Sequence, residues 1–241
     1  MKNRIRMMMV FAVLAMAGAA PAAEDGWSFK LTPYLWALGV DGEVGAGRAV
    51  ASVDVDFIDA VEDLELGGML SAEASHGRWS ILGDVAYLRL KDDAGSPLGE
   101  FELELEQWLA QGAVTYQLVQ AGKTTLDLGA GGRYLSLDTT LNTPLNQPDR
   151  EASEGWADPI LVARLRQMFT EKFYGVLYGD IGGFGVSSDL TWQAMAAAGY
   201  EFTERCSGLF GYRYLDYDYE DGPFRFDAAE SGLALGVQVQ F

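Results

Sequence analysis

The groups of this sequence that could do chemistry are carboxylates and arginines, because imidazole and thiol are almost absent. The chain of 241 residues has one histidine, His76, and one cysteine, Cys206. His76 lies in a short His-Gly-Arg segment and Cys206 lies close to Glu201 and Glu204, a poor setting for a thiolate. No Gly-x-Ser-x-Gly motif and no metal-type His/Cys cluster appears. We therefore expect no enzyme activity, no cofactor and no metal, with a carboxylate-only, glycosidase-like site as the remaining alternative.

The charged residues share one feature: each falls on the same parity of an alternating segment. In 124–134, for example, Leu126 and Leu128 alternate with Asp127 and Gly129. Successive side chains of a strand point to opposite faces, so these groups should point into a common interior. Opposite charges in a narrow lumen should pair with one another. The residues are Glu73, Asp84, Asp127, Arg133, Asp158, Arg164, Arg166, Asp180, Glu201 and Arg213, and Gln111, Gln193 and Gln238 have the same parity.

The opposite parity is apolar, and the segment 190–202 shows it most clearly. One face carries only apolar residues, with aromatics near both ends, whereas the other face is small and polar. This pattern is typical of a strand with lipid on its outer side and aromatic girdles at both interfaces. A soluble sandwich is the alternative, but it gives aromatics no reason to gather at strand ends. The expected interface aromatics are Trp27, Trp79, Trp108, Trp192, Tyr200, Phe202 and Phe241.

The alternation, the 29 glycines and the connections predict an all-β protein. Short connections at 76–78, 120–123, 170–172 and 203–206 alternate with longer ones near 92–100, 139–156 and 219–226. We predict a closed antiparallel transmembrane up-and-down β-barrel of about ten strands, with eight or twelve as alternatives. The expected strands are 27–40, 64–76, 79–91, 101–119, 124–137, 157–169, 173–186, 190–202, 208–219 and 226–241.

Three local features refine this prediction. The last strand alternates up to Phe241, and pairing it with 27–40 would close the barrel, as lipid requires. The segment 56–64 has helical spacing and predicts a short helix beside or inside the outer mouth, reached by a hairpin around Gly45–Arg48, with an ordinary surface turn of helix as the alternative. The parity of 101–119 changes near Glu106, which indicates either a bulge or emergence from the bilayer.

Composition and the N-terminal segment predict the location. Residues 1–22 combine basic residues, an apolar core and Ala-Pro-Ala, as in a signal peptide, which leaves 23–241 as the barrel. The formal net charge of −18 argues against nucleic acid as a partner. We expect a monomer in the bacterial outer membrane with both termini in the periplasm, in contact with the lipid bilayer and lipopolysaccharide.

Several strings carry a family resemblance: 32–42 (TPYLWALGVDG), 158–166 (DPILVARLR), 179–193 and 211–222. Together they resemble a family of largely uncharacterised proteobacterial outer-membrane barrels, grouped with opacity-protein and outer-membrane-protein-A-like barrels. The resemblance implies a fold and a location, and no reaction. The ending at Phe241 also resembles the C-terminal signal that the outer-membrane assembly machinery recognises.

These observations predict a structural or surface-interaction barrel with a largely salt-bridged lumen. A narrow porin-like channel for small solutes is the alternative, because the inward Gly129, Gly131 and Gly182 leave room. A lipid-modifying enzyme is a third reading, weakened because barrel hydrolases use a histidine near the outer leaflet and His76 falls on the other side. Acidic loops suggest divalent cations bridging to lipopolysaccharide, with simple solvation as the alternative, and Tyr217 and Tyr219 are expected to be interfacial anchors.

Overall fold

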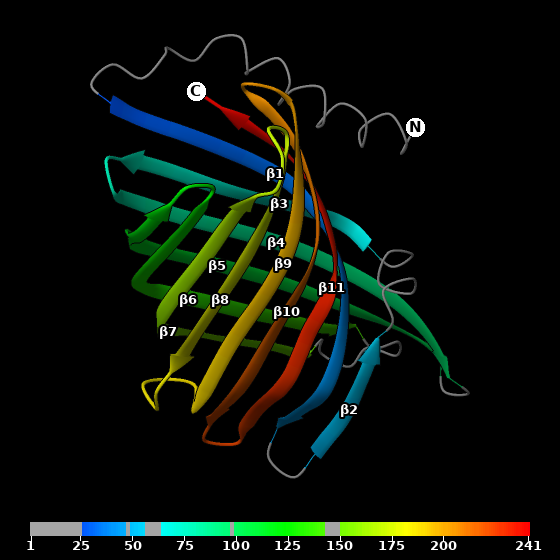
Figure 1. Cartoon of the computed structure of the whole chain (residues 1–241). Coiled ribbons are helices and arrows are strands. Elements are labelled where there is room, and N and C mark those ends of the chain that lie inside the picture. The colour runs from blue at the N-terminus through cyan, green and yellow to red at the C-terminus, as the bar shows by residue number, and fades with distance from the viewer. Residues whose placement is uncertain (1–25, 47–48, 56–63, 97–98, 143–149) are drawn as a thin grey trace.

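The computed structural model describes residues 26–46, 49–55, 64–96, 99–142 and 150–241. Within these residues, ten of eleven strands form one closed antiparallel barrel (Figure 1). The strands are β1 (Trp27–Ala46), β2 (Ala49–Val55), β3 (Leu64–His76), β4 (Trp79–Ser96), β5 (Gly99–Ala121), β6 (Thr124–Asn142), β7 (Arg150–Met168), β8 (Phe173–Gly183), β9 (Leu190–Thr203), β10 (Cys206–Asp221) and β11 (Phe224–Gln240). The predicted closed, ten-stranded, all-β architecture is confirmed.

The barrel closes where the last strand meets the first. β11 pairs antiparallel with β1 from Lys30–Gln240 to Ala46–Phe224. Beyond the ladder, the Phe241 amide donates to the Phe29 carbonyl at 2.8 Å. Closure pairs the backbone groups of the C-terminal strand that would otherwise form an open edge.

The two ends of the barrel differ. One end carries the start of β1 and the C-terminus, together with the short turns after β3, β5, β7 and β9, and we call it the terminal end (Figure 1). We call the opposite end the loop end. There the strands run farther than the sequence predicted: β4 reaches Ser96, and β10 and β11 are separated only by Gly222 and Pro223. The expected loops at 92–100 and 219–226 are therefore mostly strand.

β2 is the strand that lies outside the ring. It forms a hairpin with β1, from Val40–Val55 to Ala46–Ala49, and pairs with no other strand among the described residues. This pairing places a hairpin where the sequence predicted one. The helix expected at 56–64 falls outside the described residues except for Leu64, which begins β3. The expected signal segment 1–22 is outside them too.

No helix in the part of the chain that the structure describes is long and apolar enough to cross a membrane.

The inward glycines serve strand packing. A Cβ on Gly131 would overlap the carbonyl oxygen of Gly112, and one on Gly129 would overlap that of Val114, both on β5. A Cβ on Gly182 would likewise overlap the carbonyl oxygen of Pro159 on β7. Glycine at these positions lets neighbouring strands coil closely together, which differs from the expected role of leaving room in the lumen.

Candidate functional site: the lumen and its apolar seal

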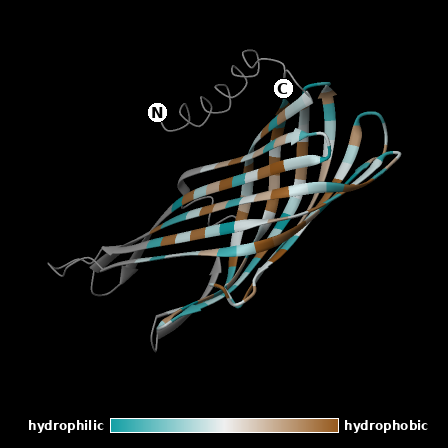
Figure 2. Ribbon diagram, turned by 90° about the vertical axis from the view of Figure 1, so that its left-hand side faces the viewer, coloured by the Kyte–Doolittle hydropathy of each residue, from teal (hydrophilic) through white to brown (hydrophobic). Residues whose placement is uncertain are grey.

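Along the strands that extend into the loop end, the apolar face changes sides partway through the barrel. On β10 the outward Phe210 is 54% exposed, whereas the inward Leu215 and Tyr217 are 0% exposed and alternate with acidic residues. The register of β10 with β11 is unbroken from Cys206 to Asp221. We call the part of the barrel from the terminal end to the level of Trp192 and Tyr214 the terminal half, and the remainder the loop half. Figure 2 shows the alternating apolar and polar residues along the strands.

The change of the apolar face from the outer to the inner side also explains the altered parity near Glu106. β5 pairs with β4 and β6 without a register shift around this residue, and its only shift lies between Gln117 and Val119. The bulge interpretation is therefore wrong. Gln107 and Leu109 point inward and are buried, while Trp108 points outward and is exposed, so only the polarity of the two faces changes.

The lumen of the loop half is filled by an apolar cluster, which we call the apolar seal. Its centre is Trp156 of β7, whose ring stacks on Tyr219 of β10 at 4.0 Å with the planes 3° apart. Tyr217 and Phe226 pack on Trp156 at 6.1 and 5.7 Å. The buried members are Trp36, Leu38, Met69, Ala86, Leu88, Leu109, Leu135, Leu137, Trp156, Leu215, Tyr217, Tyr219, Phe226 and Ala228.

The expectation that Tyr217 and Tyr219 are interfacial anchors is wrong, because both rings are buried inside the seal. The available signal was the alternation Leu-Asp-Tyr-Asp-Tyr-Glu from 215 to 220, which puts acid on one face and apolar residues on the other. Sequence analysis also missed Trp156 and the rest of the seal.

One polar pair lies within the seal. Gln107 donates to Glu230 at 2.6 Å, and both side chains are buried. This hydrogen bond offsets part of the free-energy cost of burying the two polar side chains.

Two arginines lie directly beneath the aromatic rings. The guanidinium of Arg213 faces the Trp36 ring at 4.5 Å from its centroid, and that of Arg133 faces the Tyr217 ring at 6.0 Å. Arg133 pairs with Asp180 at 2.6 Å, and their side chains are only 1% and 0% exposed. Arg133 also donates to Thr191 at 2.9 Å.

Arg213 organises a second buried network. It donates to Asp84 at 3.0 Å, to the Tyr34 hydroxyl at 2.8 Å and to Gln193 at 2.9 Å. Tyr34 in turn donates to Asp84 at 2.9 Å. Because each network links strands that are not neighbours in the sheet, the two arginines form a polar layer that fixes the lumen at this level.

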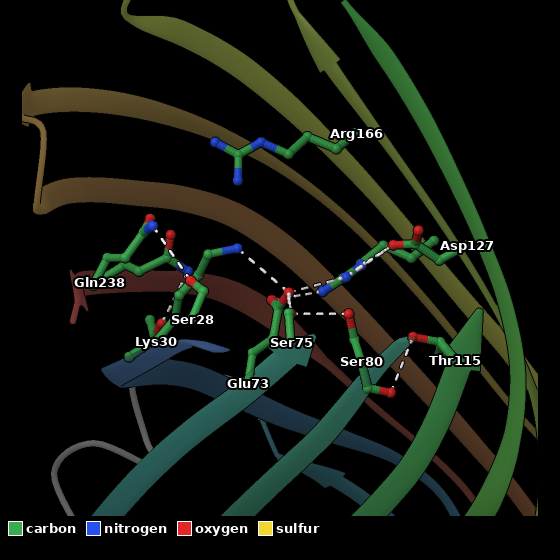
Figure 3. Close-up of polar contacts among 12 residues, drawn as sticks. Ser28, Lys30, Glu73, Ser75, Ser80, Thr115, Asp127, Arg166 and Gln238 are labelled. Carbon is green, nitrogen blue, oxygen red and sulfur yellow. Dashed lines mark hydrogen bonds and ion pairs between the residues drawn. The ribbon is translucent and has the colours of Figure 1, made fainter. Parts of the chain in front are cut away.

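The lumen of the terminal half holds a cavity of about 420 Å³ below this layer. Arg164 bridges two carboxylates on its wall, at 2.8 Å from Glu73 and 2.8 Å from Asp127. Lys30 pairs with Glu73 at 3.3 Å, and Arg166 pairs with Glu201 at 3.2 Å. Figure 3 shows Lys30, Glu73 and Asp127 on the wall, with Arg166 apart from the group around Glu73.

Asp158 differs from the other predicted lumen charges. Although it lies opposite Arg133 in the β6–β7 ladder, no described arginine pairs with it. Its carboxylate accepts from the Ser188 amide at 2.8 Å and the Ser188 hydroxyl at 2.6 Å. Asp158 therefore holds the β8–β9 turn in place. Each of the other nine predicted charges forms an ion pair with another charged side chain of the lumen.

The predicted interface aromatics lie on the outer face. Near the terminal end are Trp27, Trp79, Tyr200, Phe202 and Phe241, and toward the loop half are Trp108 and Trp192. All are exposed except Phe241, which is half-buried. Trp192 stacks on Tyr214 at 4.9 Å and Trp108 packs on Tyr87 at 4.5 Å. The outer face between these two levels is rich in exposed Leu, Ile, Val and Phe.

Above Trp192 and Tyr214 the outer face becomes acidic. Asp218 of β10, Asp227 of β11 and Glu43 of β1 lie directly opposite one another in adjacent ladders. Partial burial and the neighbouring Asp227 and Asp189 raise the pKa of Asp218. Arg225 offsets part of this charge by pairing with Asp227 at 2.8 Å. We call this group the acidic collar.

His76 and Cys206 both lie at the terminal end. His76 is exposed and packs on Trp27 at 5.1 Å, and Cys206 begins β10. Among the described residues, no group of three or more His, Cys, Asp or Glu side chains is arranged to hold a metal ion.

These features define a closed β-barrel of the outer-membrane type. No family model matches the chain, and no curated protein matches it significantly. Among solved structures it is similar to the outer membrane protease OmpT from Escherichia coli, with 9% identity, 92% of this chain and 99% of that chain covered, and a TM-score of 0.53.

Two further solved structures are similar at lower scores. Ail, the attachment invasion locus protein of Yersinia pestis, has 11% identity, coverage of 90% and 100%, and a TM-score of 0.42. Neisserial surface protein A has 13% identity, coverage of 90% and 97%, and a TM-score of 0.34. The likeness to OmpT shows the fold, which agrees with the resemblance to outer-membrane barrels inferred from the sequence.

Proposed function

We propose that this protein is a non-conducting outer-membrane barrel of structural or surface-interacting type. Its terminal half spans the bilayer with both termini in the periplasm, and its loop half rises beyond the outer leaflet. The exposed apolar side chains between the two aromatic levels support this placement. The acidic collar then lies at the level of the lipopolysaccharide phosphates.

The proposal includes the maturation steps inferred from the sequence. Residues 1–22 are removed on export, the strand that ends at Phe241 is read by the assembly machinery, and the mature barrel is a monomer. The periplasmic placement of the C-terminus is supported by the short turns that share its end of the barrel.

The apolar seal is the observation that carries the non-conducting function. Its members come from eight strands around the ring, and the Trp156–Tyr219 stack crosses the lumen above the short β8–β9 hairpin. An ion would have to lose its hydration to pass between these buried apolar side chains. The arginine layer beneath adds fixed charge pairs that fill the remaining section.

A narrow solute channel is the alternative, and the 420 Å³ cavity is the observation that favours it. The cavity would serve as the periplasmic vestibule of such a channel. Both the arginine layer and the apolar seal would have to move to connect it to the loop end.

Planar-bilayer recording tests the proposal. The purified barrel should give no conductance steps, and neither should a variant with Arg164→Ala and Arg166→Ala, because both residues lie below the seal. Steady conductance of the unaltered protein would overturn the non-conducting function and establish the channel.

We propose further that the barrel catalyses no hydrolysis. The position of His76 at the terminal end, away from the loop mouth, supports this view. Phospholipid or lipopolysaccharide hydrolysis that is lost on changing Asp84 or Glu73 would contradict it.

A further inference from the structure

The lumen of the terminal half is a blind pocket, open at the terminal end and closed by the arginine layer and the apolar seal. Its wall is divided chemically. Lys30 of β1 and Arg164 and Arg166 of β7 form its charged wall, whereas Ala197, Gly211 and Ala234 line the stretch of β9 to β11 that lies between those two strands. The cavity exists because the inward positions of β9 to β11 carry side chains too small to meet the charged wall.

Hydrogen-bond accounting shows an excess of donors at this wall. Glu73 is saturated, because it accepts from Lys30, Ser75 and two nitrogens of Arg164. Lys30 has three donors and uses one of them, on Glu73 at 3.3 Å.

Arg166 is the least committed of the three cations. Its side chain is 28% exposed, and only Nη2 finds an oxygen, on Glu201 at 3.2 Å. Nε and Nη1 have no partner among the described residues. The guanidinium lies 3.9 Å above the Tyr174 ring, which holds it in one plane. A planar guanidinium with open donors is suited to a carboxylate or phosphate.

We propose that this pocket binds a small organic anion from the periplasmic side, with its oxyanion between Arg166 and Lys30 and a short apolar body on the small-residue wall. A volume of about 420 Å³ is within the usual range for small-molecule sites. The residues that line the pocket include five basic side chains (Lys30, Arg78, Arg164, Arg166 and Arg213) and three carboxylates (Glu73, Asp84 and Asp127), and this excess of positive charge disfavours a cation. The blind end makes the pocket a receptor site, so binding does not depend on transport.

Titration calorimetry on the full barrel in lipid nanodiscs tests this proposal, with empty nanodiscs as the baseline. Four probes separate the contributions of the oxyanion and the apolar chain. Hexanoate has both, inorganic phosphate has only the oxyanion, and hexanol has only the apolar chain. Hexyltrimethylammonium has the apolar chain with a positive charge in place of the oxyanion. Hexanoate should bind with a dissociation constant of about 1 mM or tighter. Phosphate should bind more weakly, and the other two should give no saturable heat.

Matched variants locate the site. Arg166→Gln should weaken hexanoate at least about tenfold. Arg205→Gln removes the same charge from an exposed turn at the same end, outside the pocket, and should have no effect. Ala197→Leu fills the small-residue wall and should remove the advantage of hexanoate over phosphate, while the heat-resistant gel mobility of the folded barrel reports that folding is intact.

The proposal is overturned if hexanoate gives no saturable heat, if hexyltrimethylammonium binds as tightly, or if Arg205→Gln weakens binding as much as Arg166→Gln. None of these results depends on conductance, so the proposed non-conducting function stands or fails separately.

Discussion

In the terminal half of the barrel the apolar side chains of β10 point outward, whereas in the loop half they point inward, although one unbroken strand runs through both. Phe210 and Tyr212 face out, while Leu215, Tyr217 and Tyr219 face in. The hydrophobic effect accounts for the loop half, where water surrounds the wall and apolar groups collect inside. In the terminal half lipid replaces water outside, so the lumen takes the polar groups.

The comparison teaches that the parity of a strand and its polarity are separate properties. The backbone fixes which residues share a face, and the surrounding solvent decides which face is apolar. The boundary between the two regimes lies near Trp192 and Tyr214, which stack on the outer face where the change occurs.

The largest effect is expected at the centre of the apolar seal. Trp156→Ala removes the ring that contacts Tyr219, Tyr217 and Phe226, and should lower the free energy of unfolding by about 3–5 kcal/mol. Trp79→Ala is the control, because this ring is exposed on the outer face of the terminal half and should cost less. Unfolding by guanidinium in lipid vesicles measures the free energy of unfolding of both variants. An equal decrease in the two variants would contradict a buried apolar core in the loop half.

A charge placed on the outer face should distinguish the halves. Leu161→Arg puts a cation on the apolar outer face of the terminal half and should cost about 2–4 kcal/mol. Ala229→Arg puts the same residue on the outer face of the loop half, in the ladders opposite Asp216 and Asp41, and should cost nothing measurable. The same unfolding experiment applies. A comparable penalty at both sites would place the membrane boundary elsewhere.

Two glutamines on β5 compare the lumen of the two halves. Gln107→Ala leaves Glu230 buried without its partner in the seal and should cost about 1–3 kcal/mol. Gln111→Ala removes an acceptor of Arg133 beside the cavity, where water can take its place, and should cost less. If Gln111→Ala proves the more costly, the lumen below the arginine layer is not hydrated.

The smallest effect is expected from the acidic collar. Burial and the charges of Asp227 and Asp189 raise the pKa of Asp218 above its ordinary value. The folded state then binds this proton more tightly than the unfolded chain, so stability rises as the pH falls through the folded pKa. Asp227→Asn should flatten this dependence in unfolding curves between pH 7 and about pH 4. An unchanged slope would show that the collar charges do not interact.

Much of the fold follows from the sequence because period-two alternation is a local property. The ten ring strands and the closing pair could be predicted from it. The ion-pair partner of each charged side chain could not be predicted, because it depends on how far each strand is shifted along its neighbours. Arg133 lies opposite Asp158 in the ladder but reaches Asp180 one strand farther on, and Asp158 holds Ser188.

The apolar seal escaped prediction for a different reason. A strand that alternates acidic and aromatic residues looks like an interfacial loop when only its charge is considered. Its inner face is identifiable only once the outer solvent is known to have changed from lipid to water. Trp156 gives the same difficulty, since it falls at the end of the expected long connection 139–156, close to Glu154.

Maleimide labelling along β10 in intact cells tests the reversal of polarity most directly. Single cysteines are placed from 208 to 220 in a Cys206→Ser background, and a membrane-impermeant reagent is added outside. The outward positions 216, 218 and 220 should react. The outward positions 208 to 214 should be protected by lipid, and 215, 217 and 219 by the seal. Rapid reaction at 212 and 214, or at 215 and 217, would contradict the account.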